Sequence, residues 1–131
     1  MAGITDIDKL LCSMKPELQP GEMVFCTVSR QLDDYNALPV IATFVETEGL
    51  TLVLKKEDAE SAGLEFDGLF RQITLTVHSS LEAVGLTAAV ATKLASKGIS
   101  ANVMAAYYHD HIFVQSEKAE LAIAALNEFS S

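Results

Sequence analysis

The sequence predicts an α+β fold in which antiparallel sheets carry helices on one face. Three observations lead to this prediction. Short runs of alternating, β-branched residues recur along the chain, and they are typical of half-buried strands. Helical runs with apolar residues at spacings of three and four separate them. Gly, Pro and Asp mark the connections, so the elements are short and follow one another closely.

Composition limits the kinds of partner. The chain has 131 residues, 50% of them hydrophobic, which is enough for one compact domain or two very small ones that share a core. Its formal net charge is −9, so we expect no nucleic acid and no anionic membrane as a partner, because Lys and Arg hold both. The sequence shows no signal peptide and no apolar run of membrane-spanning length, so a cytoplasmic protein is expected.

The two cysteines argue against a fold held together by disulfide bonds or by a structural zinc site. Cys12 and Cys26 are the two cysteines, and neither belongs to a CxxC pair. Both lie among apolar residues, which predicts two buried free thiols in a reducing compartment.

The first half is predicted as helix, three strands and helix. The first helix begins at Thr5 or Asp6 and runs to about Met14, and Pro16 ends it. A strand is expected over 23–28, followed by a polar loop over 29–38 and by two further strands over 40–45 and 50–54. A short helix over 56–63 then stops at Gly63.

The two β-rich runs 40–45 and 50–54 are predicted to form a hairpin. The sequence Glu46-Thr47-Glu48-Gly49 joins them as a tight connection. We interpret Glu46 and Glu48 as a solvated hairpin tip, and a cation site at the junction of the modules is the alternative.

The second half is organised around the stretch from Val77 to Ile99. A strand over 72–77 is followed by a polar loop over 78–82 and by a helix that Gly98 stops. The apolar stripe of this helix is predicted as Val84, Ala88, Ala91, Leu94 and Ala95.

A hairpin and a last helix complete the second half. Strands are expected over 100–107 and 112–114, with a turn at His109-Asp110. Ser116 is predicted to cap a helix over 117–129. Its inward residues are expected to be Leu121, Ala122, Ala125, Leu126 and Phe129.

The order of elements predicts a ferredoxin-like arrangement. From Phe70 onward the order is β-α-β-β-α, which corresponds to most of the βαββαβ pattern. The first half also carries a hairpin followed by a helix, so we predict two tandem modules, residues 1–67 and 68–131. This fold hosts many unrelated functions, so the site must decide the function.

The second half resembles an ACT domain over 73–114. The resemblance lies in the strand ITLTV, the loop leading into Val84-Gly85-Leu86-Thr87, the helix ending in Lys97-Gly98-Ile99, and the strand after Tyr108-His109-Asp110. The whole chain resembles small stand-alone proteins with two tandem ACT-like modules, and it is similar to the amino-acid-sensing ACT pairs of aspartate kinases.

The resemblance implies a ligand site. ACT modules bind amino acids or similar effectors, usually where two modules meet, through the loop after the first strand and through an acceptor on the hairpin. Carried over to this sequence, the implied ligand-binding residues are His78, Ser79, Ser80, Glu82, Val84, Gly85, Leu86, Thr87, Tyr108 and Asp110. Asp110 suits an α-ammonium group, and the N–H groups at the helix start suit an α-carboxylate.

Several of these residues also have a purely structural interpretation. Ser79 or Ser80 caps a helix, Glu82 favours the positive helix end, and Asp110 is a common turn residue. Gly85 permits a close approach by a ligand backbone or by a partner strand.

Two further groups of side chains are weighed in the same way. His109 and His111 form an HxH pair that could hold a metal, but solvated turn histidines are the interpretation we favour, and no metal is predicted. Of Tyr107 and Tyr108, one is expected to point into the core and the other away from it.

The sequence therefore predicts a small-molecule regulatory protein and not an enzyme. We expect an amino acid as effector, no cofactor, and a homodimer or higher oligomer, because a small sheet leaves edges to cover. An acylphosphatase would need an Arg in the loop after Val77, a metal chaperone would need a CxxC there, and RNA binding would need basic residues on the sheet. A protein-interaction module without a ligand remains the alternative.

Overall fold

The computed structural model describes residues 7–29, 37–76 and 85–130. The chain divides into two compact units. One is continuous in sequence and comprises residues 21–70; the other is discontinuous and joins residues 1–20 to residues 71–131. The module boundaries predicted from the sequence, 1–67 and 68–131, stay a prediction. In the described part of the chain, no helix is long and apolar enough to cross a membrane.

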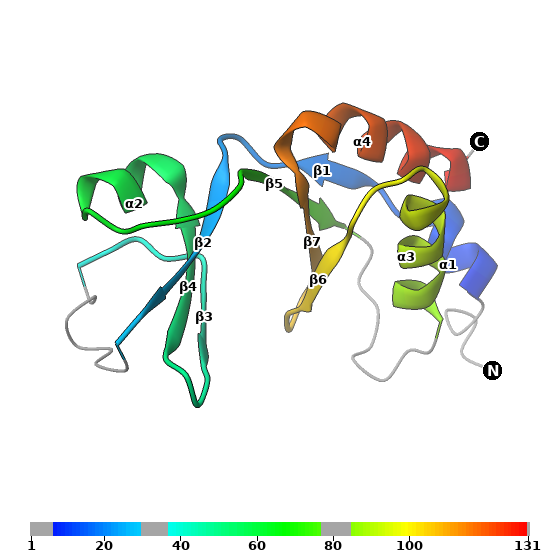
Figure 1. The fold of residues 1–131 in the computed structure, drawn as a ribbon. Coiled ribbons are helices and arrows are strands. Elements are labelled where there is room, and N and C mark those ends of the chain that lie inside the picture. The colour runs from blue at the N-terminus through cyan, green and yellow to red at the C-terminus, as the bar shows by residue number, and fades with distance from the viewer. Residues whose placement is uncertain (1–6, 30–36, 77–84, 131) are drawn as a thin grey trace. The chain divides into compact units, whose positions relative to one another are not determined.

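The continuous unit is built on strand β2, Met23–Val28. Strand β4, Leu50–Lys55, pairs antiparallel with β2 along its whole length, and strand β3, Ala42–Val45, pairs antiparallel with β4. Phe70, the first residue of β5, pairs with Met23 on the other side of β2. Helix α2, Lys56–Ser61, follows β4 directly (Figure 1). The predicted strands and the predicted hairpin are confirmed.

The continuous unit has a core of its own. Alternate residues of β2 and β4 pack with Ala59 of α2, and this period-two burial follows from the pleat of the strands. The core residues are Val24, Cys26, Leu50, Leu52, Leu54 and Ala59. Burial raises the pKa of the Cys26 thiol. The expectation that both cysteines are buried is wrong for Cys12, which is exposed on a short helix.

The sheet of the discontinuous unit has the strand order β1-β5-β7-β6. Its strands are β1, Pro16–Leu18; β5, Phe70–Leu75; β6, Asn102–Ala105; and β7, Asp110–Gln115. β1 pairs antiparallel with β5, Pro16 facing Leu75. The sequence did not predict β1, because it has three residues and begins with a proline that cannot donate a hydrogen bond.

Three helices cover the core of the discontinuous unit (Figure 1). They are α1, Ile7–Ser13; α3, Leu86–Ser96; and α4, Ala119–Asn127. They meet alternate residues of the strands, among them Ile73, Leu75, Ile112 and Val114. α3 contacts both α1 and α4.

The predicted apolar stripe of α3 is largely wrong. The helix buries Leu86, Val90 and Leu94, at spacings of four, whereas Ala88 and Ala95 are exposed. Alanines fit either face of a helix, so the larger Leu and Val side chains decide which face turns inward.

The last helix begins later than predicted. Ser116 does not cap it, because Ser116–Lys118 form a 3-10 helix and α4 starts at Ala119. α4 buries Ala122, Ala125 and Leu126 as predicted, but Leu121 is 48% exposed. The predicted α+β, ferredoxin-like fold class with antiparallel pairing is confirmed.

Gly49 closes the β3–β4 hairpin where another strand comes near. The backbones of Glu46 and Gly49 exchange hydrogen bonds of 2.9 and 3.2 Å. A Cβ atom at position 49 would lie 2.7 Å from the carbonyl oxygen of Val28 and 3.1 Å from Thr27 Oγ1. The position therefore has no room for a side chain.

We predict that Gly49→Ala lowers the free energy of unfolding by roughly 1–3 kcal/mol, because β2 and the hairpin must move apart. Gly63→Ala is the matched control: its φ of +71° disfavours alanine, but its Cβ would meet no atom within 4 Å. Urea denaturation should show the larger loss for Gly49→Ala. An equal or smaller loss would contradict the close approach.

Candidate functional site

Helix α3 begins directly after Gly85, which is its N-cap residue. Gly85 has a φ of +102°, a left-handed conformation that other residues rarely adopt, and its carbonyl accepts the first helical hydrogen bond from Ala89 N at 2.9 Å. The N–H groups of the first turn have no acceptor within the helix, so they can receive an anionic group.

The environment of Gly85 differs from the one expected. A Cβ at this position would lie 3.6 Å from Ile7 Cδ1, so the close neighbour is a side chain of α1. Leu86 is 2% exposed and belongs to the core, which leaves its backbone as the part that a ligand could contact. Thr87 is exposed. His78, Ser79, Ser80, Glu82 and Val84 lie outside the described residues.

The β6–β7 hairpin places Asp110 at the start of β7. Asp110 pairs with Ala105, and Ala106 N donates to the carbonyl of His109 at 3.0 Å, which fixes the turn. Asp110 is half-buried. Its carboxylate makes no hydrogen bond or ion pair with another described residue. It is therefore an acceptor that an incoming cationic group can use.

The two tyrosines lie in the turn and not in a strand. Tyr107 and Tyr108 are 75% and 64% exposed, and their rings meet edge to face with centroids 5.0 Å apart. The expectation that one of them points into the core is wrong, because β6 ends at Ala105 and the alternation of a strand no longer applies.

A polar cluster lies on the face of the β5–β7 pair opposite the helices. His111 Nδ1 lies 3.2 Å from Gln72 Nε2 and 3.1 Å from Thr74 Oγ1. Gln19 Nε2 donates to Thr74 Oγ1 at 3.0 Å. Gln72 and Thr74 are buried. Sequence reasoning missed this cluster, although Gln72 and Thr74 alternate with the core residues Ile73 and Leu75.

The remaining acidic and imidazole groups show no metal site. Glu46 is exposed, and its Oε1 accepts a hydrogen bond of 2.6 Å from Thr51 Oγ1. His109 Nδ1 is buried and has no hydrogen-bond partner among the described residues. Within residues 7–29, 37–76 and 85–130, no group of three or more His, Cys, Asp or Glu side chains could hold a metal ion.

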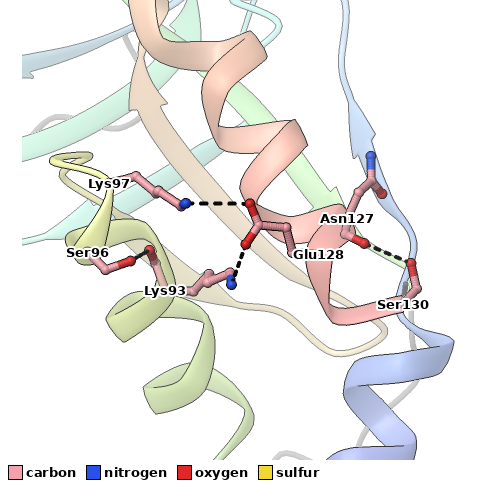
Figure 2. Close-up of polar contacts among 6 residues, drawn as sticks. All are labelled: Lys93, Ser96, Lys97, Asn127, Glu128 and Ser130. Atoms are coloured by element: carbon pink, nitrogen blue, oxygen red, sulfur yellow. Dashed lines mark hydrogen bonds and ion pairs between the residues drawn. The ribbon is translucent and has the colours of Figure 1, made fainter.

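Ion pairs fix the far end of α3 to the end of α4 (Figure 2). Lys93 Nζ lies 2.6 Å from Glu128 Oε1, and Lys97 Nζ lies 3.5 Å from Glu128 Oε2. The hydrogen bond from Lys93 is the main reason that the pKa of Glu128 is lowered. Lys93 also lies 5.5 Å from the centre of the Phe129 ring. These contacts are partly exposed, so each is expected to contribute little to stability.

Two family models match this chain, one over each half of the sequence. A family model described as ACT domain matches residues 2–71, and a second one with the same description matches residues 70–128. The chain therefore belongs to the ACT domain family and carries two ACT modules in tandem, which confirms the resemblance. No protein with a curated description matches the chain.

Solved structures agree with this assignment. A Vibrio cholerae protein of unknown function, described as a possible transport protein, is 64% identical with a TM-score of 0.90 and covers 99% of this chain and 100% of its own. An Agrobacterium tumefaciens protein is 17% identical with a TM-score of 0.71, covering 89% of each chain. The ligand-free regulatory subunit of aspartate kinase from Thermus thermophilus is 14% identical with a TM-score of 0.67, covering 86% of this chain and 94% of its own.

We predict that stability depends on pH through His111. Burial lowers its pKa below the ordinary 6.5, the charge of His109 adds to this, and Asp110 opposes it. Because the folded pKa lies below the unfolded one, the contribution of neutral His111 is complete above pH 6.5 and is lost as pH falls through the folded pKa.

Urea denaturation at about pH 7.5 and about pH 5 measures this contribution. The free energy of unfolding should fall more for the native chain than for His111→Gln, and His109→Gln should show a smaller fall than the native chain, because the charge of His109 helps to lower the pKa of His111. Equal decreases for the native chain and His111→Gln would show that His111 does not carry the effect.

Proposed function

We propose that this protein is a non-catalytic regulatory protein that binds an amino acid as its effector. The two ACT modules support this proposal, because ACT domains are regulatory modules that bind small-molecule effectors such as amino acids. The likeness to the regulatory subunit of an aspartate kinase supports the fold on which such regulation is built.

The observation that carries the proposal is the unused carboxylate of Asp110. A half-buried carboxylate that has no partner among the described residues is costly, and a ligand ammonium group offsets this cost by a charge-assisted hydrogen bond. In our proposal Asp110 receives the α-ammonium group of the ligand.

The start of α3 supplies the other end of the proposed site. The N–H groups that follow Gly85 are free of helical acceptors and favour a carboxylate. In the proposal, Thr87 contributes a hydroxyl group, Leu86 contributes its backbone, and Tyr108 covers the ligand. The predicted residues His78, Ser79, Ser80, Glu82 and Val84 remain part of it.

The proposal also covers the oligomeric state and the cellular location of the protein. Among the described residues, β3 pairs with β4 alone and β6 with β7 alone, so each unit leaves an edge strand that a second copy can cover. We propose a cytoplasmic homodimer or higher oligomer.

A protein-interaction module is the second candidate. Exposed apolar side chains gather on the two hairpins, Phe44 and Val45 on one and Tyr107 and Tyr108 on the other. Such side chains are typical of protein contacts. This candidate predicts that no amino acid binds, so a ligand screen separates it from the first.

Calorimetric titration with the common amino acids tests the proposed site. We predict that one amino acid binds and that Asp110→Asn weakens it by roughly tenfold to a hundredfold, since a hydrogen bond to a charged group is lost. Asp67→Asn, an exposed carboxylate of the continuous unit, is the matched control and should bind as the native chain does.

Analogues of the bound amino acid assign each end. The N-acetyl analogue lacks the charged ammonium group, and the amide lacks the carboxylate. Both should bind the native chain weakly. In Asp110→Asn the N-acetyl group should cost little more, whereas the amide should still cost its full amount, as expected for independent contacts. If the N-acetyl analogue loses as much affinity in Asp110→Asn as in the native chain, Asp110 does not bind the ammonium group.

A further inference from the structure

His111 connects the polar cluster to the candidate site. It follows Asp110 directly on β7, and its Nδ1 atom contacts Gln72 and Thr74 on β5. The side chain of His111 is half-buried, on the face of β7 opposite the core residues Ile112 and Val114. The state of this imidazole therefore bears on where β7 begins, and so on the position of Asp110.

The contact with Gln72 requires an acceptor at Nδ1, and the Thr74 hydroxyl group can supply a donor to the same atom. Gln72 contacts it through an amide nitrogen, which can only donate a hydrogen bond. Thr74 Oγ1 already accepts from Gln19 Nε2 and has its own proton to donate to Nδ1. Both contacts fit a neutral imidazole that carries its proton on Nε2. A proton on Nδ1 would face a donor and force the cluster to rearrange.

The charges that face His111 are few among the described residues. β5 contributes the neutral side chains of Gln72 and Thr74, and the residue opposite on β6 is Met104. The ionisable groups that act on it are His109 and Asp110. Of the two, Asp110 is the group that favours a positive charge on His111.

We propose that His111 is a positioning residue for Asp110 and that occupation of Asp110 by a cationic group is coupled to loss of a proton from His111. The inference rests on the proposed function. It adds that the site binds its effector in competition with a proton on the next residue along β7, His111, so a fall in pH weakens binding.

Two effects make ligand binding at Asp110 and proton binding at His111 oppose each other. A ligand ammonium group neutralises Asp110, which removes the charge that stabilises protonated His111. In the reverse direction, a proton on His111 Nδ1 would face the donor Gln72 Nε2 and disturb the hydrogen bonds of the cluster beside Asp110. Because linkage is reciprocal, both directions have the same magnitude. We expect a factor on the order of two to five, as for partly exposed charges.

Proton NMR titration of the His111 imidazole in the free protein tests the coupling without any ligand. Asp110→Asn mimics neutralisation and should weaken proton binding at His111 by roughly two- to fivefold. Gln72→Met removes the donor that favours the neutral form and should strengthen proton binding. Asp67→Asn should leave the titration unchanged. An unchanged titration in Asp110→Asn would overturn the proposal.

Calorimetry of the effector in two buffers of different ionisation enthalpy completes the test. Binding near the pKa of His111 should release protons in the native chain and in His109→Gln, but not in His111→Gln. Release that persists in His111→Gln would overturn the proposal while leaving the effector site intact. If Asp110→Asn shifts the titration but no amino acid binds, the coupling stands and the proposed function fails.

Discussion

The pairing of β1 with β5 is the constraint on which the discontinuous unit depends. It joins residues that are far apart in sequence through hydrogen bonds from Gln19 N to Gln72 O at 2.8 Å and from Thr76 N to Lys15 O at 3.1 Å. Because the chain is held there, α1 can place Leu10, Leu11 and Met14 in the same core as α3 and α4. The strand is short, but it closes the sheet around which this core packs.

In the proposed site, both the residue at the start of α3 and the residue at the start of β7 depend on this arrangement. Its backbone end, Gly85, lies against Ile7 of α1, so the helix that β1 holds in place also supports the start of α3. Its acidic end, Asp110, is set by the register of β6 on β7. The cluster of Gln19, Thr74 and His111 then ties the β1 end of the sheet to the residue next to Asp110.

The sequence predicted the elements whose structure depends on neighbouring residues. The alternation in residues 23–28 and the Gly49 turn define β2 and the hairpin, because strand burial and turn geometry depend on neighbouring residues. β1 was not predictable, since three residues beginning with Pro16 carry no periodic signal. The buried face of α3 was misjudged because its alanines suit either face, and only packing against α1 and α4 selects Leu86, Val90 and Leu94. The contact between His111 and Thr74 joins residues 37 positions apart and becomes visible only in the fold.

The most direct test of the account is an amide NMR titration of the isotope-labelled protein with the amino acid that binds in calorimetry. The account predicts that the largest chemical-shift changes fall on Gly85, Leu86 and Thr87 at the start of α3 and on Asp110 and His111 at the start of β7. It also predicts little change in the core strand β2. Changes confined to the continuous unit, or spread evenly over both units, would contradict a site built on α3 and β7.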